Sequence, residues 1–258
     1  FRNSPGKSLG SSRSARCISG SNQQHTMKLV LIPCPISENT ASDVLPADVS
    51  KYVLLCKHYL VENIRTARRF ISELKLGINI DELTFAILDK DSTKSEISSF
   101  ISAHKQEEFI GVLSEAGCPG IADPGALAVS IAQEMNIEVI PLVGPSSILL
   151  ALMGSGFSGQ NFTFHGYLPI DKDLKAKKLN LLAREVEKTG FTHLFIETPF
   201  RNNGMLEDII NNSPANLLIC IACDVTSPSG FIKTKSAQTW KNELPDLHKR
   251  PCIFLLGQ

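Results

Sequence analysis

The chain alternates short apolar runs with longer amphipathic segments. The apolar runs are rich in valine, isoleucine, leucine and phenylalanine and have few polar residues at alternate positions, which is typical of strands covered on both faces. They predict a first series of strands at 29–32, 52–56, 84–88, 109–113 and 137–142, and a second series at 162–165, 193–197, 217–223, 231–234 and 252–256.

The amphipathic segments carry helix signals. One apolar face recurs at helical spacing and contains Ile64, Ala67, Phe70, Ile71 and Leu74. Thr93 and Glu96 predict a capping box, and Asp123 followed by Pro124 predicts an N-cap with proline in the first helical position. A further stripe, which we expect to end at Gly190, contains Leu179, Leu182, Ala183 and Val186.

Strands that alternate with helices predict an α/β fold with parallel or mixed sheets flanked by helices. The turn-rich segment 143–147 lies near the middle of the chain. We therefore predict two α/β domains, at 27–143 and 144–258.

Residues 1–26 differ from the rest. They are rich in serine, glycine, asparagine and glutamine and hold four basic residues and no acid, so 22 basic and 26 acidic residues remain, a net charge of −4. We expect a disordered leader that does not belong to the folded body, with Met27 as the true start. No apolar run approaches the ~20 residues of a membrane span, so we expect a soluble protein without membrane contact. Its odd number of scattered cysteines leads us to expect a cytoplasmic one.

Two motifs favour structural interpretations. Gly154, Gly156 and Gly159 match a dinucleotide fingerprint, but they follow a helix-like run and precede a strand, the reverse of the required order. Cys220 and Cys223 have redox-motif spacing but lie in one predicted strand, where such residues point to opposite faces.

The seven cysteines of the chain are scattered along the sequence. This distribution fits reduced, buried thiols, and we expect no metal site.

The segment "LSEAGCPGIADPG" at 113–125 has a more informative context. It joins a predicted strand to a predicted helix, and open α/β sheets bind ligands beyond the carboxyl ends of their strands. Its glycines let backbone groups approach a ligand, and its prolines stiffen the loop. Segments 32–39 and 141–147 end two other strands with similar residues, so the sequence predicts one binding cleft lined by three loops.

These motifs together resemble the tetrapyrrole-methylase superfamily of S-adenosylmethionine (SAM) dependent methyltransferases, and most of all its branch that methylates a cytidine 2′-hydroxyl in small-subunit ribosomal RNA. The resemblance runs in order from Met27 to the end of the chain. The matching segments are "PCPISE" at 33–38, "ENIR" at 62–65, "SEAGCP" and "DPG" within 114–125, "PLVGP" at 141–145, "HGYLP" at 165–169 and "FIETPFR" at 195–201.

The resemblance implies SAM bound in a cleft between the two domains, a homodimer, and an rRNA or 30S-subunit substrate. The implied cofactor-binding residues are Pro33, Glu115, Ala116, Gly117, Cys118, Pro119, Gly144, Pro145 and Ser147. The implied catalytic residues are Glu62, Arg65, Glu197 and Arg201, with Glu62 and Arg65 near the substrate end of the cleft.

Departures from the family pattern keep two alternatives open. Asn63 replaces an acid, and 37–43 replaces a glycine-containing segment. The sequence is therefore also consistent with two other functions. One is a SAM-dependent methylase of a small molecule such as a tetrapyrrole, and the other is a SAM-binding module without catalysis.

Overall fold

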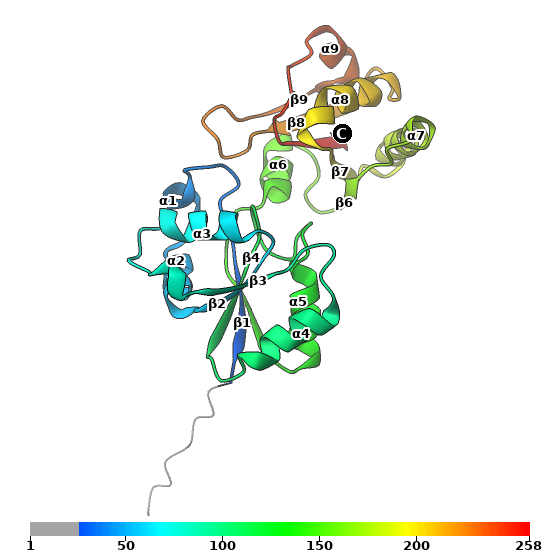
Figure 1. The fold of residues 1–258 in the computed structure, drawn as a ribbon. Helices are drawn as coiled ribbons and strands as arrows, with labels where there is room; N and C mark the ends of the chain where they lie inside the picture. Colours follow the sequence, from blue (N-terminus) through cyan, green and yellow to red (C-terminus); the bar gives the residue numbers. More distant parts are fainter. Residues whose placement is uncertain (1–25) are drawn as a thin grey trace, which may run out of the picture.

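The computed structural model describes residues 26–258, so the predicted leader lies almost entirely outside the described residues. Two five-stranded sheets follow one another along the chain (Figure 1). The first has the strand order β3-β2-β4-β1-β5 and the second β6-β7-β10-β8-β9. The α/β fold with a parallel and a mixed sheet is the predicted one.

All strands of the first sheet are parallel. They are β1 (Lys28–Ile32), β2 (His58–Val61), β3 (Thr84–Ile87), β4 (Phe109–Leu113) and β5 (Glu138–Pro141). The helices of this half are α1 (Ala41–Val44), α2 (Ala47–Leu55), α3 (Ile64–Glu73), η1 (Ile80–Glu82), α4 (Lys94–Ala103) and α5 (Gly125–Glu134). Figure 1 shows α2 and α3 on one side of the sheet and α4 and α5 on the other, so both faces are buried.

The second sheet is mixed: β6 and β7 are parallel, and the remaining pairs are antiparallel. Its strands are β6 (Phe162–Tyr167), β7 (Thr192–Ile196), β8 (Leu218–Cys223), β9 (Phe231–Ser236) and β10 (Cys252–Gly257). The helices of this half are α6 (Ser147–Ser155), α7 (Lys172–Thr189), η2 (Pro199–Arg201), α8 (Asn202–Asn211) and α9 (Ala237–Asn242). Residues of α7, α8 and α9 cover one face and α6 covers the other.

One strand prediction is wrong. Residues 52–56 lie in and just after α2, and the second strand of the chain is β2 instead. Pro46 stands at the N-cap, and Val49 and Val53, four residues apart, are the buried residues of the helix. A short apolar run does not by itself distinguish a buried strand from a helix turned toward the core.

The capping box of α4 is confirmed, as is the left-handed glycine after α7. Gly156 likewise ends α6 with a φ of 80°, so the glycine-rich motif is a helix end and not a nucleotide loop. Cys220 and Cys223 pack into hydrophobic clusters on opposite faces of the second sheet, as expected for a strand.

The chain crosses from one sheet to the other between β5 and α6, because α6 packs against β8, β9 and β10. The predicted boundary at 143 and 144 lies in this crossing; that the two halves are separate domains stays a prediction. No helix within residues 26–258 is both long and apolar enough to cross a membrane.

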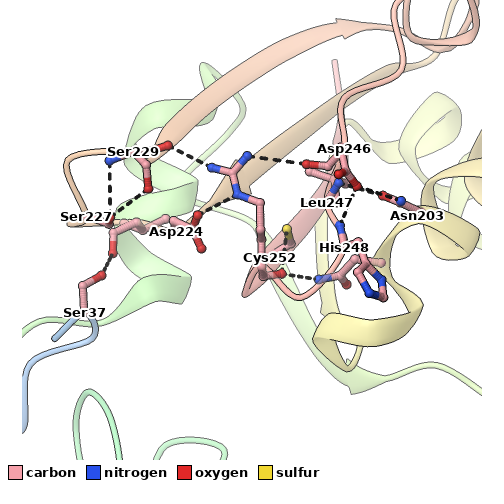
Figure 2. Close-up of polar contacts among 12 residues, drawn as sticks. Ser37, Asn203, Asp224, Ser227, Ser229, Asp246, Leu247, His248 and Cys252 are labelled. Atoms are coloured by element: carbon pink, nitrogen blue, oxygen red, sulfur yellow. Dashed lines mark hydrogen bonds and ion pairs between the residues drawn. The ribbon is translucent and has the colours of Figure 1, made fainter.

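A polar contact also joins the two halves away from this crossing. Ser37, after β1, donates from Oγ to the carbonyl oxygen of Val225 at 3.1 Å, and Thr226 donates to Ser37 Oγ at 3.3 Å. Arg250 fixes this β8–β9 loop by donating to Asp224 Oδ2 at 2.7 Å and to the Ser229 carbonyl at 2.9 Å. Figure 2 shows Ser37 beside the loop that carries Asp224 and Ser227.

Candidate functional site

The three predicted loops meet because they leave the carboxyl ends of adjacent parallel strands, β4, β1 and β5. Cys34 and Gly117 exchange backbone hydrogen bonds of 2.9 and 3.0 Å. Cys118 Sγ donates to the Pro145 carbonyl at 3.3 Å. Gly144 lies directly against Pro33, since a Cβ on Gly144 would stand 2.1 Å from the Pro33 Cβ. The loops therefore form one connected surface.

The loop after β4 needs its glycines for their backbone conformation. Gly117 and Gly120 have φ of 75° and 85°, in the left-handed region that side chains disfavour. Asp123 Oδ1 accepts the N–H groups of Gly120 and Gly125 at 2.6 and 2.8 Å and so closes the loop onto the start of α5. The predicted cap is corrected here: Pro124 is the N-cap, and the helix begins at Gly125.

A cleft of about 370 Å³ lies between this loop surface and the second sheet. One wall comes from the loop after β4, together with Glu62 at the end of β2 and the start of α6. The second sheet supplies the apolar and aromatic side chains Phe164, Tyr167, Ile196 and Ile253. Backbone, hydroxyl and carboxylate groups thus face apolar ones, which is the usual composition of a small-molecule site.

The polar wall is acidic. The Glu115 backbone N–H donates to Glu62 Oε1 at 3.4 Å. Burial raises the pKa of the Glu62 carboxyl, and the negative charge of Asp123 raises it further. The hydrogen bond from the Glu115 N–H lowers it, but by less. Burial also raises the pKa of Asp123, although its two N–H donors oppose the shift. Carboxylates that repel one another in a partly dry cleft favour a cationic ligand.

The structure brings six of the predicted residues to the cleft lining: Glu62, Glu115, Ala116, Gly117, Cys118 and Ser147. Pro33, Pro119, Gly144 and Pro145 do not line it; they belong to the connected loops that form its wall, and three of them are buried. These four residues therefore hold the loops in place and do not face the cleft.

The loop after β1 does not line this cleft as expected. Residues 34–39 instead line a neighbouring cavity of about 400 Å³, opposite side chains of α3. Glu115 lines both cavities, so the two adjoin.

Three predicted catalytic residues do not line the cleft. Arg65 is exposed on α3, whose N-cap is Asn63. Glu197 and Arg201 form an ion pair of 2.6 Å after β7, with Glu197 nearly buried and Arg201 half-exposed. Burial alone would raise the pKa of Glu197, but hydrogen bonds from Arg201 and the Thr198 N–H and the charge of Lys175 hold it below its usual range.

Sequence reasoning missed the second wall of the cleft and part of the first. The missed lining residues are Ile148, Phe164, Tyr167, Ile196 and Ile253; Ile121, Ala122, Asp123 and Ser146 lie within the predicted loops but were not among the predicted site residues. Asp123 carried a signal, because a carboxylate between two glycines suits a loop-closing acceptor. The residues of β6, β7 and β10 carried none, since their position depends on how the two halves pack.

A histidine pair outside the cleft gives a pH-dependent prediction. His165 Nε2 lies 3.0 Å from His193 Nδ1, and His193 Nε2 lies 3.5 Å from Glu185. Burial lowers the pKa of His165 to about 4, and the positive charges of Lys178 and His193 act in the same direction, against Glu185. In the unfolded chain the pKa of this histidine is ~6.5. Above that pH the neutral His165 stabilises the folded state, and this stabilisation is lost as the pH falls toward 4.

We therefore expect the urea midpoint of the protein to fall between pH 7 and pH 5, and to fall less in His165→Gln. Urea unfolding followed by circular dichroism at both pH values measures this difference. An equal fall in the variant would contradict the assignment to His165.

The comparisons with known proteins agree with the fold. No protein-family model matches the chain. It is similar to proteins named ribosomal RNA small subunit methyltransferase I from Buchnera aphidicola of Schizaphis graminum (30% identity, 66% of this chain, 59% of that one), Vibrio cholerae (31%, 61% and 53%) and Hydrogenobaculum (28%, 78% and 81%). The chain spans less than two thirds of the length of the first relatives it matches.

Solved structures share the fold. The methyltransferase CobJ superposes with a TM-score of 0.60 at 16% identity, over 90% of this chain and 94% of that one. Uroporphyrin-III C-methyltransferase from Thermus thermophilus gives a TM-score of 0.56 at 13% identity, over 90% and 97%. The resemblance is therefore confirmed in sequence to the rRNA methyltransferases and in fold to the tetrapyrrole methyltransferases.

Proposed function

We propose that the chain is a SAM-dependent methyltransferase that methylates a cytidine 2′-hydroxyl in small-subunit rRNA. The observation that carries the proposal is the cleft at the carboxyl ends of β4, β1 and β5, where a glycine-rich loop faces the second sheet. The name shared by the sequence relatives supports the substrate class. A homodimer in the cytoplasm is part of the same proposal.

The chemistry of the cleft suits SAM. The carboxylates Glu62, Glu115 and Asp123 match its positive charges and its ribose hydroxyls, and the apolar side chains of the second sheet match its adenine. Ser146 and Ser147 bring the N-terminus of α6 to the same cleft, where N–H groups attract a carboxylate. When bound, SAM supplies an electrophilic methyl group, and the protein supplies orientation and a dry site.

Glu62 is the proposed general base. A ribose hydroxyl is a weak nucleophile, and its proton must leave as the oxygen attacks. The raised pKa of Glu62 makes its carboxylate a stronger base than an ordinary glutamate. Arg65, Glu197 and Arg201 stay predicted catalytic residues on the strength of their motifs alone.

Transfer of a labelled methyl group to purified 30S subunits that lack the modification tests this function. We expect label in the rRNA, released as a 2′-O-methylated nucleoside on digestion. Label on a tetrapyrrole precursor instead of rRNA would overturn the substrate, and binding of SAM without transfer to either would support a non-catalytic module.

A further inference from the structure

Beside the cleft, three loops of the second sheet present an exposed group of aromatic and cationic side chains. We call this group the aromatic rim; it consists of Tyr167, Phe200, Arg201, His248 and Lys249, all exposed. Tyr167 is 62% exposed and Phe200 68%. Tyr167 ends β6, Phe200 and Arg201 follow β7, and His248 and Lys249 precede β10. Neighbouring exposed rings of this size mark an interaction surface.

Three side chains of the rim contact one another. The rings of Phe200 and His248 meet edge to face with centroids 5.9 Å apart, and Lys249 Nζ lies 5.8 Å from the Phe200 centroid. The ion pair with Glu197 raises the pKa of the Arg201 guanidinium, and the nearby Tyr167 adds to this shift. Phe200, His248 and Lys249 therefore form one contacting cluster, with Arg201 and Tyr167 on the neighbouring loop and strand end.

The backbone beneath the rim is fixed by hydrogen bonds. Lys249 N–H donates to the Pro199 carbonyl at 3.0 Å, which ties the loop before β10 to the loop after β7. Asp246 Oδ1 accepts the His248 N–H and the Asn203 side-chain amide, each at 3.0 Å, and Leu247 N–H donates to Asn203 at 2.7 Å (Figure 2). A surface held in this way loses little conformational entropy when a ligand binds.

The charge of the rim favours an anionic ligand. The Glu197 side chain is 2% exposed while its partner Arg201 is 47% exposed, so the ion pair presents the cation to solvent. Lys249 adds an ammonium group and His248 adds an imidazole. Asp246 is the exposed acid here, and it is engaged by the hydrogen bonds that hold the loop.

We propose that the aromatic rim binds unpaired nucleotides of RNA next to the nucleotide held in the cleft. Phe200 and Tyr167 offer ring faces on which bases stack, and Arg201 and Lys249 lie beside them to meet phosphates. Tyr167 also lines the cleft, so an RNA strand on the rim leads directly into it. This inference rests on the proposed function, since it names how the RNA is held.

The test measures binding of a fluorescein-labelled single-stranded RNA of about 12 nucleotides to the full chain by fluorescence anisotropy. We expect Phe200→Ala to weaken binding about tenfold, and Phe200→Trp to restore it, because stacking contributes ~1–3 kcal/mol per base. Lys249→Gln should reduce the salt dependence by about one phosphate contact. The matched controls are Phe191→Ala, just before β7, and Lys188→Gln, in the last turn of α7; both should bind as the parent protein does, and Phe191 is 41% exposed.

Unchanged RNA affinity in Phe200→Ala, or no RNA binding by the parent protein, would overturn the proposal that the aromatic rim binds RNA. A change of oligomeric state in Phe200→Ala, seen by analytical ultracentrifugation without loss of RNA affinity, would overturn it in favour of a second copy of the chain. Methyl transfer to 30S subunits by the parent protein is measured separately, so the proposed function stands or fails independently.

Discussion

Replacing Gly144 by alanine is expected to lower SAM affinity at least about tenfold and to destabilise the fold by ~1–3 kcal/mol. The new Cβ would stand 2.1 Å from Pro33 Cβ and 2.4 Å from Pro33 Cγ, both belonging to a buried ring. The loops after β1 and β5 must then separate. Because Cys118 donates to the adjacent Pro145 carbonyl, the loop that lines the cleft moves with them. Calorimetric titration with SAM and urea unfolding measure the two effects.

Gly159→Ala is the matched control, since a Cβ there meets no atom within 4 Å. It should keep both SAM affinity and stability. Full SAM affinity in a folded Gly144→Ala protein would show that the contact between the two loops does not shape the cofactor site.

Glu62→Gln is expected to reduce turnover at saturating SAM at least about 100-fold. An amide keeps the shape of the side chain but takes up no proton. In the parent protein the raised pKa of Glu62 predicts that turnover falls, as the pH is lowered, at a higher pH than for an ordinary glutamate. This limb of the profile should be absent from the variant.

Glu115→Gln removes the same charge from the same cleft and serves as the comparison. Its turnover at saturating SAM should stay within about tenfold of the parent protein. Similar losses in both variants would mean that the cleft needs negative charge but not a base at Glu62.

The sequence predicted much of the first sheet because its inner strands β1 and β4 are largely buried on both faces and read as continuous apolar runs. It failed at 52–56, where an equally apolar run lies on a helix that packs Val49 and Val53 against the sheet. The distinction depends on which side of the run meets the core, and a run of five residues does not contain that information.

The site likewise has one part that the sequence predicts and one part that it does not. The glycine loop around Gly117 was predictable because a left-handed backbone needs a particular residue type. The opposite wall was not, since Phe164, Ile196 and Ile253 are ordinary strand residues until the second sheet is placed against the loop. Arg65 shows the limit of a motif: it follows Glu62 by three residues in the sequence, but only Glu62 lines the cleft.

Calorimetric titration of the full chain with SAM, beside its Gly117→Leu variant, tests the central claim most directly. We predict a dissociation constant on the order of micromolar for the parent protein and no detectable binding by the variant. A Cβ at Gly117 would lie 3.4 Å from the Pro145 carbonyl oxygen, so the first atom of the new side chain fits, and circular dichroism checks that the variant folds. Its left-handed backbone would add only ~1–2 kcal/mol of strain. No binding by the parent protein, or equal binding by the folded variant, would contradict a SAM site in this cleft.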